Sequence, residues 1–202
     1  MSDTEKANYH HGDLRAALLS AAEAELAQAG PHGFSLRACA RRAGVSHAAP
    51  KHHFGSVDGL LDALAAMGFR RLTAAMTDAM ARAVPERRLI ASGTGYVAFA
   101  RENPSLFKLM FSARRVEPPG PELAEAGAEA FAVLRLAASQ AAPGRPEREA
   151  ALDIAAAWSI VHGLAHLVIE APPAMRALLG EDAREAAIAD VLERPLPIGR
   201  GG

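Results

Sequence analysis

Hydrophobic residues recur every three or four positions along most of the chain, a spacing that is typical of helices with one buried face. Capping residues, glycines and prolines divide this pattern into segments. The pattern predicts helices over residues 12–29, 35–43, 46–53, 56–84, 104–111, 121–141, 146–170 and 182–193, and a further helix that begins at residue 85. No stretch alternates polar and apolar residues as a strand would, so we expect an all-α protein.

The segment from Ser35 to Phe54, SLRACARRAGVSHAAPKHHF, has the pattern of a helix, a tight turn and a second, shorter helix. Ser35 and Ser46 are placed to cap the two helices, because a serine hydroxyl can accept a backbone amide hydrogen there. Gly44 follows the last apolar position of the first helix and can adopt the left-handed conformation that turns the chain. We therefore predict a helix-turn-helix, a unit that binds DNA.

Acidic residues are absent from Leu26 to Val57, whereas cations and histidines are frequent there. The cations are Arg37, Arg41, Arg42 and Lys51, and the histidines among them are His47, His52 and His53. A polyanion such as DNA would be attracted to this part of the surface. Small three-helix units of other kinds can also combine a capped helix, a glycine turn and basic residues, and the spacing alone leaves that alternative open.

Within residues 9–64, the motifs YHHGDLRAALLSAA and GVSHAAPKHHF, followed by two leucines, resemble the N-terminal domain of the tetracycline-repressor (TetR) family. AWSIVHGLAHL at residues 157–167 resembles the Trp-His-Gly signature of one subgroup of its regulatory domains. The resemblance implies a three-helix helix-turn-helix domain followed by a helical ligand-binding and dimerisation domain. Two positions depart from the family pattern: Lys51 replaces a common tyrosine that contacts a DNA phosphate, and Val57 replaces a common lysine.

The residues expected to contact DNA lie at the start of the first helix of this unit and on its second helix. They are Ser35, Arg37, Ser46, His47, Ala48, Ala49, Lys51, His52 and His53. His47 and His52 are the candidates for contacts with base edges, while the small Ala48 and Ala49 permit close approach. The Ser46 hydroxyl, the Lys51 ammonium and the His53 imidazole are expected to contact DNA phosphates.

At 202 residues, 50% of them hydrophobic, the chain is long enough for a small DNA-binding domain and a larger domain with its own core. We expect the DNA-binding domain over residues 1–57, with residues 1–11 as a polar, mobile arm, and the regulatory domain over 58–202. The helix predicted over 56–84 would span roughly 40 Å, enough to belong to both. The net charge of −1 excludes a general polycation, so DNA must bind a local patch.

The single cysteine, Cys39, excludes an intramolecular disulfide framework and fits a reducing cytoplasm. Its position on the apolar face of the first helix of the helix-turn-helix favours a buried thiol over a redox sensor. No segment approaches about 18 uninterrupted apolar residues, and the N-terminus lacks the hydrophobic core of a signal peptide. We therefore expect a cytoplasmic protein that does not enter a membrane.

The regulatory domain contains aromatic and methionine side chains that could enclose a small molecule. They are Met76, Tyr96, Phe99, Phe107, Met110, Phe131 and Trp158, to which His162 adds an imidazole. Tyr96 and His162 would supply the few hydrogen bonds, so the effector is expected to be mostly apolar. The alternative, that these residues simply fill the core, remains open.

Trp158, His162, His166 and Glu170 follow one another every four residues and would form one stripe along a helix. The two histidines have a spacing that can bind a metal, which leaves a metal-binding protein or enzyme as the alternative function. The zinc-protease pattern, however, needs a glutamate where Gly163 stands. No nucleophile, base and orienting acid are apparent, so we expect no catalytic residues, no bound metal, no cofactor and no enzymatic activity.

The helices predicted over residues 146–170 and 182–193 carry apolar faces at the end of the chain. As the TetR resemblance implies, we expect them to pair with a second copy in a four-helix interface. A homodimer would place two reading helices one DNA turn apart and select a palindromic operator. Taken together, the sequence predicts a repressor that a small molecule releases from double-stranded DNA.

Overall fold

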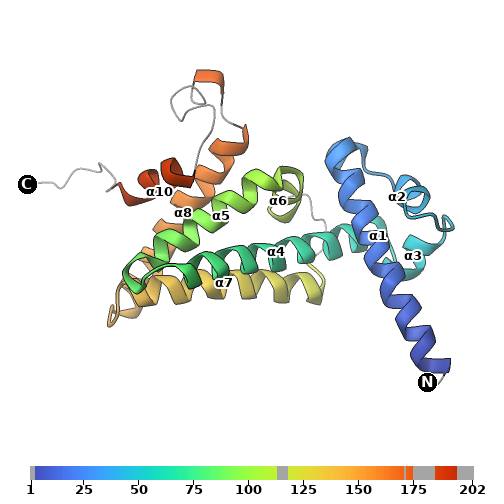
Figure 1. The fold of residues 1–202 in the computed structure, drawn as a ribbon, viewed down its shortest axis with the longest axis horizontal. Helices are drawn as coiled ribbons and strands as arrows, with labels where there is room; N and C mark the ends of the chain where they lie inside the picture. The colour runs from blue at the N-terminus through green and yellow to red at the C-terminus, as the bar shows by residue number, and fades with distance from the viewer. Residues whose placement is uncertain (1–2, 113–117, 171, 175–184, 195–202) are drawn as a thin grey trace, which may run out of the picture. The chain divides into compact units, whose positions relative to one another are not determined.

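The computed structural model describes residues 3–112, 118–170, 172–174 and 185–194, and every element among them is a helix (Figure 1). The helices are α1 (Asp3–Gly33), α2 (Leu36–Arg42), α3 (Ala49–Phe54), α4 (Val57–Arg82), the 3-10 helix η1 (Pro85–Arg87), α5 (Arg88–Glu102), α6 (Pro104–Met110), α7 (Pro121–Ala141), α8 (Glu147–Glu170) and α10 (Glu185–Glu193). The predicted all-α class is confirmed. The first residues of the helix predicted over 182–193 lie outside the described part.

The chain forms two compact units. The first unit comprises residues 1–70 and 105–128, and therefore contains α1, α2, α3, most of α6 and the first parts of α4 and α7. The second unit comprises residues 71–104 and 129–202. Each is described separately below. The division expected between residues 57 and 58 stays a prediction.

α1 is longer than the pattern indicated. It begins at Asp3, where we expected a polar arm as far as residue 11. Residues 3–11 contain no glycine or proline, and Asp3 and Glu5 lie in the first turn, where acidic residues favour a helix. The predicted stop is confirmed, because Gly30 adopts φ 67° and ψ 177° and interrupts the helix.

The core of the first unit contains residues of α1, α2, α3, α4 and α6. Its fully buried side chains include Leu18, Leu26, Cys39, Pro50, Leu60, Leu64 and Phe107. At Gly68 a Cβ atom would stand only 2.6 Å from the Met110 sulfur, so α4 and α6 pack too closely for a side chain there. This core supports the α2–α3 surface from behind.

In the second unit, α5 packs against α8 and α10 (Figure 1). A Cβ atom on Gly95 would lie 2.7 Å from the Ala75 carbonyl oxygen of α4, and one on Gly93 would lie 2.9 Å from a Leu192 methyl group of α10. Both glycines therefore serve close helix packing.

Candidate DNA interface and ligand site

The turn between α2 and α3 is formed by the signals expected from the sequence. Ser35 is the N-cap of α2, and its Oγ accepts the Ala38 amide hydrogen at 3.4 Å. Gly44 has φ 68°, and the following Val45 amide donates to the Ala40 carbonyl at 3.0 Å. This left-handed turn and its hydrogen bond close α2 and redirect the chain toward α3.

The predicted start of α3 is wrong. The helix begins at Ala49, with Ala48 as its N-cap and no side-chain capping hydrogen bond. Ser46 instead accepts the Ala49 amide hydrogen through its backbone carbonyl at 3.1 Å. Pro50 explains the later start, because proline needs no amide partner in the first turn and favours that position. Gly55, at φ 74°, then ends a helix of six residues.

Most of the residues predicted to contact DNA are exposed. Arg37, Ser46, His47, Ala48, Lys51 and His52 are exposed, while Ser35, Ala49 and His53 are half-buried. The Ser35 hydroxyl is engaged in the α2 cap, and the His53 ring lies 5.4 Å from His52 and 6.4 Å from Phe54, measured between centroids. Lys51 and His52 therefore present the most accessible cationic and imidazole groups on α3.

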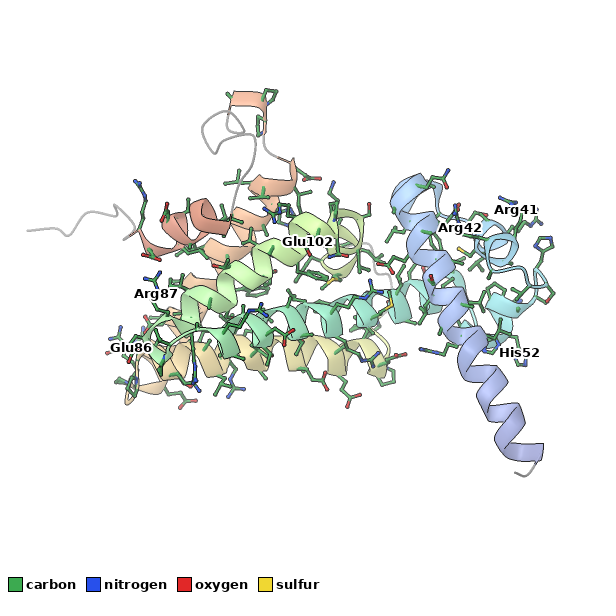
Figure 2. The ribbon with its side chains drawn as sticks, viewed as in Figure 1. Arg41, Arg42, His52, Glu86, Arg87 and Glu102 are labelled. Carbon is green, nitrogen blue, oxygen red and sulfur yellow. The ribbon has the colours of Figure 1, made fainter. Side chains whose placement is uncertain are left out.

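Arg42 is tethered to α1 (Figure 2). Its Nη2 donates to Gln28 Oε1 at 2.6 Å and lies 3.6 Å from Glu25 Oε2, so the basic patch is partly neutralised. The acid-free stretch that begins at Leu26 does not reveal this contact, because Glu25 stands just before it. The neighbouring Arg41 is exposed and is a DNA-contact candidate that the predicted set omitted.

Cys39 is completely buried, as predicted. Burial raises the pKa of its thiol to about 11, and the Glu25 carboxylate acts in the same direction. The thiol therefore stays protonated at neutral pH and packs as a small apolar side chain.

Two arginines and a glutamate connect α1, α4 and α7 in the first unit, and one of the arginines also contacts an aromatic ring of α3. The Arg15 guanidinium of α1 lies 5.4 Å from the centre of the Phe54 ring of α3, and it donates to Glu122 of α7 at 2.7 Å. Arg70 of α4 donates to the other oxygen of the same carboxylate at 2.9 Å. Nearby, the Gly120 amide donates to Asp62 at 3.1 Å. Through Arg15, Glu122 of α7 thus connects the end of α3 with α1 and α4, and local sequence patterns do not reveal these contacts.

In the second unit, Tyr96 and His162 lie together, with 2.8 Å between the phenol oxygen and Nδ1. Burial raises the pKa of Tyr96 well above its ordinary value of 10, while a side-chain hydrogen bond with Trp158 acts in the opposite direction. Burial also lowers the pKa of His162 below 6.5, and His166 adds to that effect. His162 is therefore neutral at pH 7 and can accept the Tyr96 hydroxyl hydrogen.

Further aromatic rings of α8 and α7 lie next to this pair. Ring centroids are 6.3 Å apart for Phe131 and Trp158, 6.0 Å for Trp158 and His162, and 4.7 Å for His162 and His166. Phe131 and Trp158 are each 43% exposed. We call Tyr96, Phe131, Trp158 and His162 the aromatic cluster. It contains four of the eight residues that were predicted to bind an effector.

The other predicted effector residues are core residues. Met76 and Phe99 are buried in the second unit. Phe107 and Met110 belong to the first unit, where the Phe107 ring lies 4.9 Å from Phe111 and Met110 packs beside Gly68. For these four residues, packing accounts for the observed burial.

The metal alternative requires a third ligand. Within the described ranges, no three His, Cys, Asp or Glu side chains gather as a metal site needs, so Glu170 does not complete a set with His162 and His166.

A cavity of about 310 Å³ opens in the second unit. Its walls come from the end of α4, η1, α5 and α10, and are formed by Ala79, Arg82, Ala83, Arg87, Ile90, Ala91, Thr94 and Ala189. It shares no residue with the aromatic cluster.

Family models match both parts of the chain. Residues 18–64 match the bacterial regulatory proteins of the tetR family, and residues 89–191 match the tetracyclin repressor-like C-terminal domain. Neither match identifies the Trp-His-Gly subgroup. No curated protein matches the chain.

Solved structures show the same fold. A protein of unknown function from Rhodococcus sp. RHA1 is 35% identical, with 91% of this chain and 95% of the other covered and a TM-score of 0.70. A transcriptional regulator from Rhodococcus sp. Rha1 is 24% identical, with 88% and 93% covered and a TM-score of 0.63. The TetR family regulator PfmR from Thermus thermophilus is 20% identical, with 88% and 99% covered and a TM-score of 0.58.

The two family models cover the helix-turn-helix and most of the remaining helices, and the Rhodococcus relative extends the sequence similarity over nearly the whole chain. Regulators of this kind are generally DNA-binding proteins without enzymatic activity. The chain therefore belongs to the TetR family and is a DNA-binding transcriptional regulator.

Proposed function

We propose that this regulator is a cytoplasmic, homodimeric repressor that binds a palindromic operator through α2 and α3 and leaves it when a small molecule binds. The observation that carries the proposal is the exposure of His47, Lys51 and His52 on the turn and short helix that follow α2. No acidic residue lies between Leu26 and Val57, so the surrounding stretch attracts a polyanion.

On this surface, different side chains have different tasks. The Lys51 ammonium neutralises a phosphate, which positions α3 without reading sequence. The imidazoles of His47 and His52 contact base edges in the major groove, and Ala48 allows the backbone to approach. Arg41 adds a second phosphate contact, whereas Arg42 is held back by Glu25 and Gln28.

The experiment is to select operators from random DNA and to measure binding of Lys51→Ala and His52→Ala at several salt concentrations. Lys51→Ala should weaken binding about equally for all sequences and reduce the slope of log affinity against log salt by roughly one. His52→Ala should change the preferred sequence. Arg135→Ala, an exposed cation on α7, is the control. Unchanged binding by both α3 variants would exclude this reading surface.

Dimerisation uses α8 and α10. α8 is long and apolar enough to cross a membrane by length and composition alone, since its most apolar 18-residue window has a mean hydropathy of 1.6. Only 17% of that window is buried, so most of this apolar helix is at least partly exposed. Leu152 and Leu167 are 63% and 39% exposed. In a regulator that must reach DNA, a second copy is the partner that covers this apolar face.

Pairing of two copies would place the two α3 helices about one DNA turn apart, which is ~34 Å, and would select a palindromic operator. Repression follows if this site overlaps the start of transcription. The resemblance of the Trp158–Gly163 segment to the Trp-His-Gly signature supports membership of that subgroup.

The effector contacts the aromatic cluster. Its partly exposed Phe131 and Trp158 rings offer apolar surface, and the buried Tyr96–His162 pair offers a hydroxyl and an imidazole. These groups suit a small, mostly apolar molecule fixed by one or two hydrogen bonds. Such a molecule releases DNA if it binds more tightly to a state of the dimer that has lower operator affinity.

A further inference from the structure

We propose that the cavity between the end of α4, η1, α5 and α10 binds a small amphiphilic anion, namely a carboxylate with a short aliphatic tail. The carboxylate and the aliphatic tail of this ligand each match one kind of residue in the cavity wall. One kind is cationic and consists of Arg82 and Arg87; the other is apolar and consists of Ala79, Ala83, Ile90, Ala91 and Ala189.

The polar walls select for negative charge. Among the described residues that line the cavity there is neither an aspartate nor a glutamate. Thr94, the remaining polar wall residue, already donates its hydroxyl hydrogen to the Ile90 carbonyl at 3.0 Å. Arg82 is exposed, and within the described part of the chain it makes no hydrogen bond or ion pair. A planar guanidinium can bind both oxygens of a carboxylate, so Arg82 is the primary anion contact.

Arg87 shows that a carboxylate fits at this place. Its guanidinium pairs with Glu193 at the end of α10. A ligand carboxylate bound between Arg82 and Arg87 would compete with Glu193 for the same donors. Because Ala189 of α10 also lines the cavity, a bound ligand would change the contacts that hold α10 in place.

The apolar walls restrict the tail. A volume of about 310 Å³ lies at the lower limit for small-molecule sites, so the ligand is small. The described residues that line the cavity include no aromatic ring, and its apolar walls consist of alanine methyl groups and the Ile90 side chain. These surfaces favour a flexible aliphatic chain over a planar aromatic one. The site is separate from the aromatic cluster, with which it shares no residue.

The test is isothermal titration calorimetry of the full-length protein with hexanoate. Hexan-1-ol has the same tail without the charge, and acetate has the charge without the tail. Hexanoate should bind at least tenfold more tightly than either. Arg82→Gln should weaken hexanoate binding at least tenfold, whereas the matched exposed variant Arg135→Gln should bind it as the wild type does.

A second variant tests the cavity without removing a charge. Ala91→Leu should fill it and weaken hexanoate binding, while Arg82→Gln and Ala91→Leu should keep wild-type circular dichroism and wild-type operator affinity without ligand. Equal affinity for hexanoate and hexan-1-ol, or wild-type hexanoate binding in either variant, would overturn the proposal. Because operator binding is measured on the same variants, this result is distinguishable from a failure of the DNA-binding proposal.

Discussion

At the scale of single residues, Gly95 lets α5 approach α4 more closely than any side chain would permit. Gly95→Ala would place a methyl group 2.7 Å from the Ala75 carbonyl oxygen and 3.1 Å from the Ala79 methyl group. Because backbone atoms cannot move aside cheaply, the variant should lower the free energy of unfolding by about 1–3 kcal/mol. Urea unfolding followed by circular dichroism at fixed protein concentration measures this change.

Gly127→Ala is the matched control, because a Cβ atom at Gly127 of α7 would meet nothing within 4 Å. Replacing a helical glycine by alanine in open space should raise the free energy of unfolding by up to about 1 kcal/mol. Similar effects of the two substitutions would mean that helix propensity, and not the α4–α5 contact, decides the cost at Gly95.

Single residues also show where sequence reasoning succeeds and where it ends. The Ser35 cap, the Gly44 turn and the burial of Cys39 depend on neighbours within a few positions, and all three were predicted. Ser46 was predicted as the N-cap of α3, but Pro50 favours the first turn of a helix and sets its start at Ala49. The neutralisation of Arg42 depends on packing against α1, and no local pattern encodes it.

At the scale of elements, several helix boundaries were predictable from a cap or a proline. α7 begins at Pro121 and α4 follows Ser56, whose hydroxyl accepts the Gly59 amide hydrogen at 3.0 Å. The start of α1 was missed because residues 3–11 have helix-compatible but unpatterned polar residues. The Asn103 side chain donates to the Phe99 carbonyl and closes α5, and Pro104 begins α6.

The link between elements at Glu122 has a measurable energy. Glu122→Gln removes the charge that Arg15 and Arg70 share, and these side chains are 37–48% exposed. Because water and salt screen exposed ion pairs, the free energy of unfolding should fall by at most about 1 kcal/mol, with a smaller loss at high salt. Urea titrations at two ionic strengths measure both values.

Glu125→Gln, an exposed neighbour on α7, provides the control for loss of one negative charge. If it behaved like Glu122→Gln, the effect would come from net charge and the linkage among the helices would be irrelevant. An Arg15→Ala, Glu122→Gln double-mutant cycle should give a coupling energy of the same small size.

At the scale of the whole molecule, the exposed face of α8 determines assembly. A Leu152→Glu, Leu167→Glu double variant would place four carboxylates across the proposed two-fold interface. It should sediment as a monomer at micromolar concentration and bind the operator at least tenfold more weakly. Leu136→Glu, at a 51% exposed leucine of α7, should leave both properties unchanged. A dimeric double variant would locate the interface elsewhere.

The ligand site shows most clearly what one sequence leaves undetermined at this scale. Helical periodicity identifies apolar residues that face inward, but it does not tell a pocket wall from a packed core. Tyr96 and His162 come together although 66 positions separate them, whereas Phe107 and Met110 fill the first unit. Sequence patterns do not reveal the Arg82–Arg87 cavity, because half of the described residues that line it are alanines, which carry no distinctive signal.

The burial of Cys39 also makes the protein convenient for site-directed labelling. At pH 8 a thiol with a pKa of about 11 is ionised in roughly one molecule per thousand, and this side chain is 0% exposed. Maleimides and nitroxide reagents should therefore spare the one native cysteine. A cysteine introduced at Ala48 would be the sole reactive thiol, and a dimer would carry one probe beside each reading helix. Pulsed electron spin resonance could then follow their separation on addition of DNA or a candidate effector, with the native cysteine left in place.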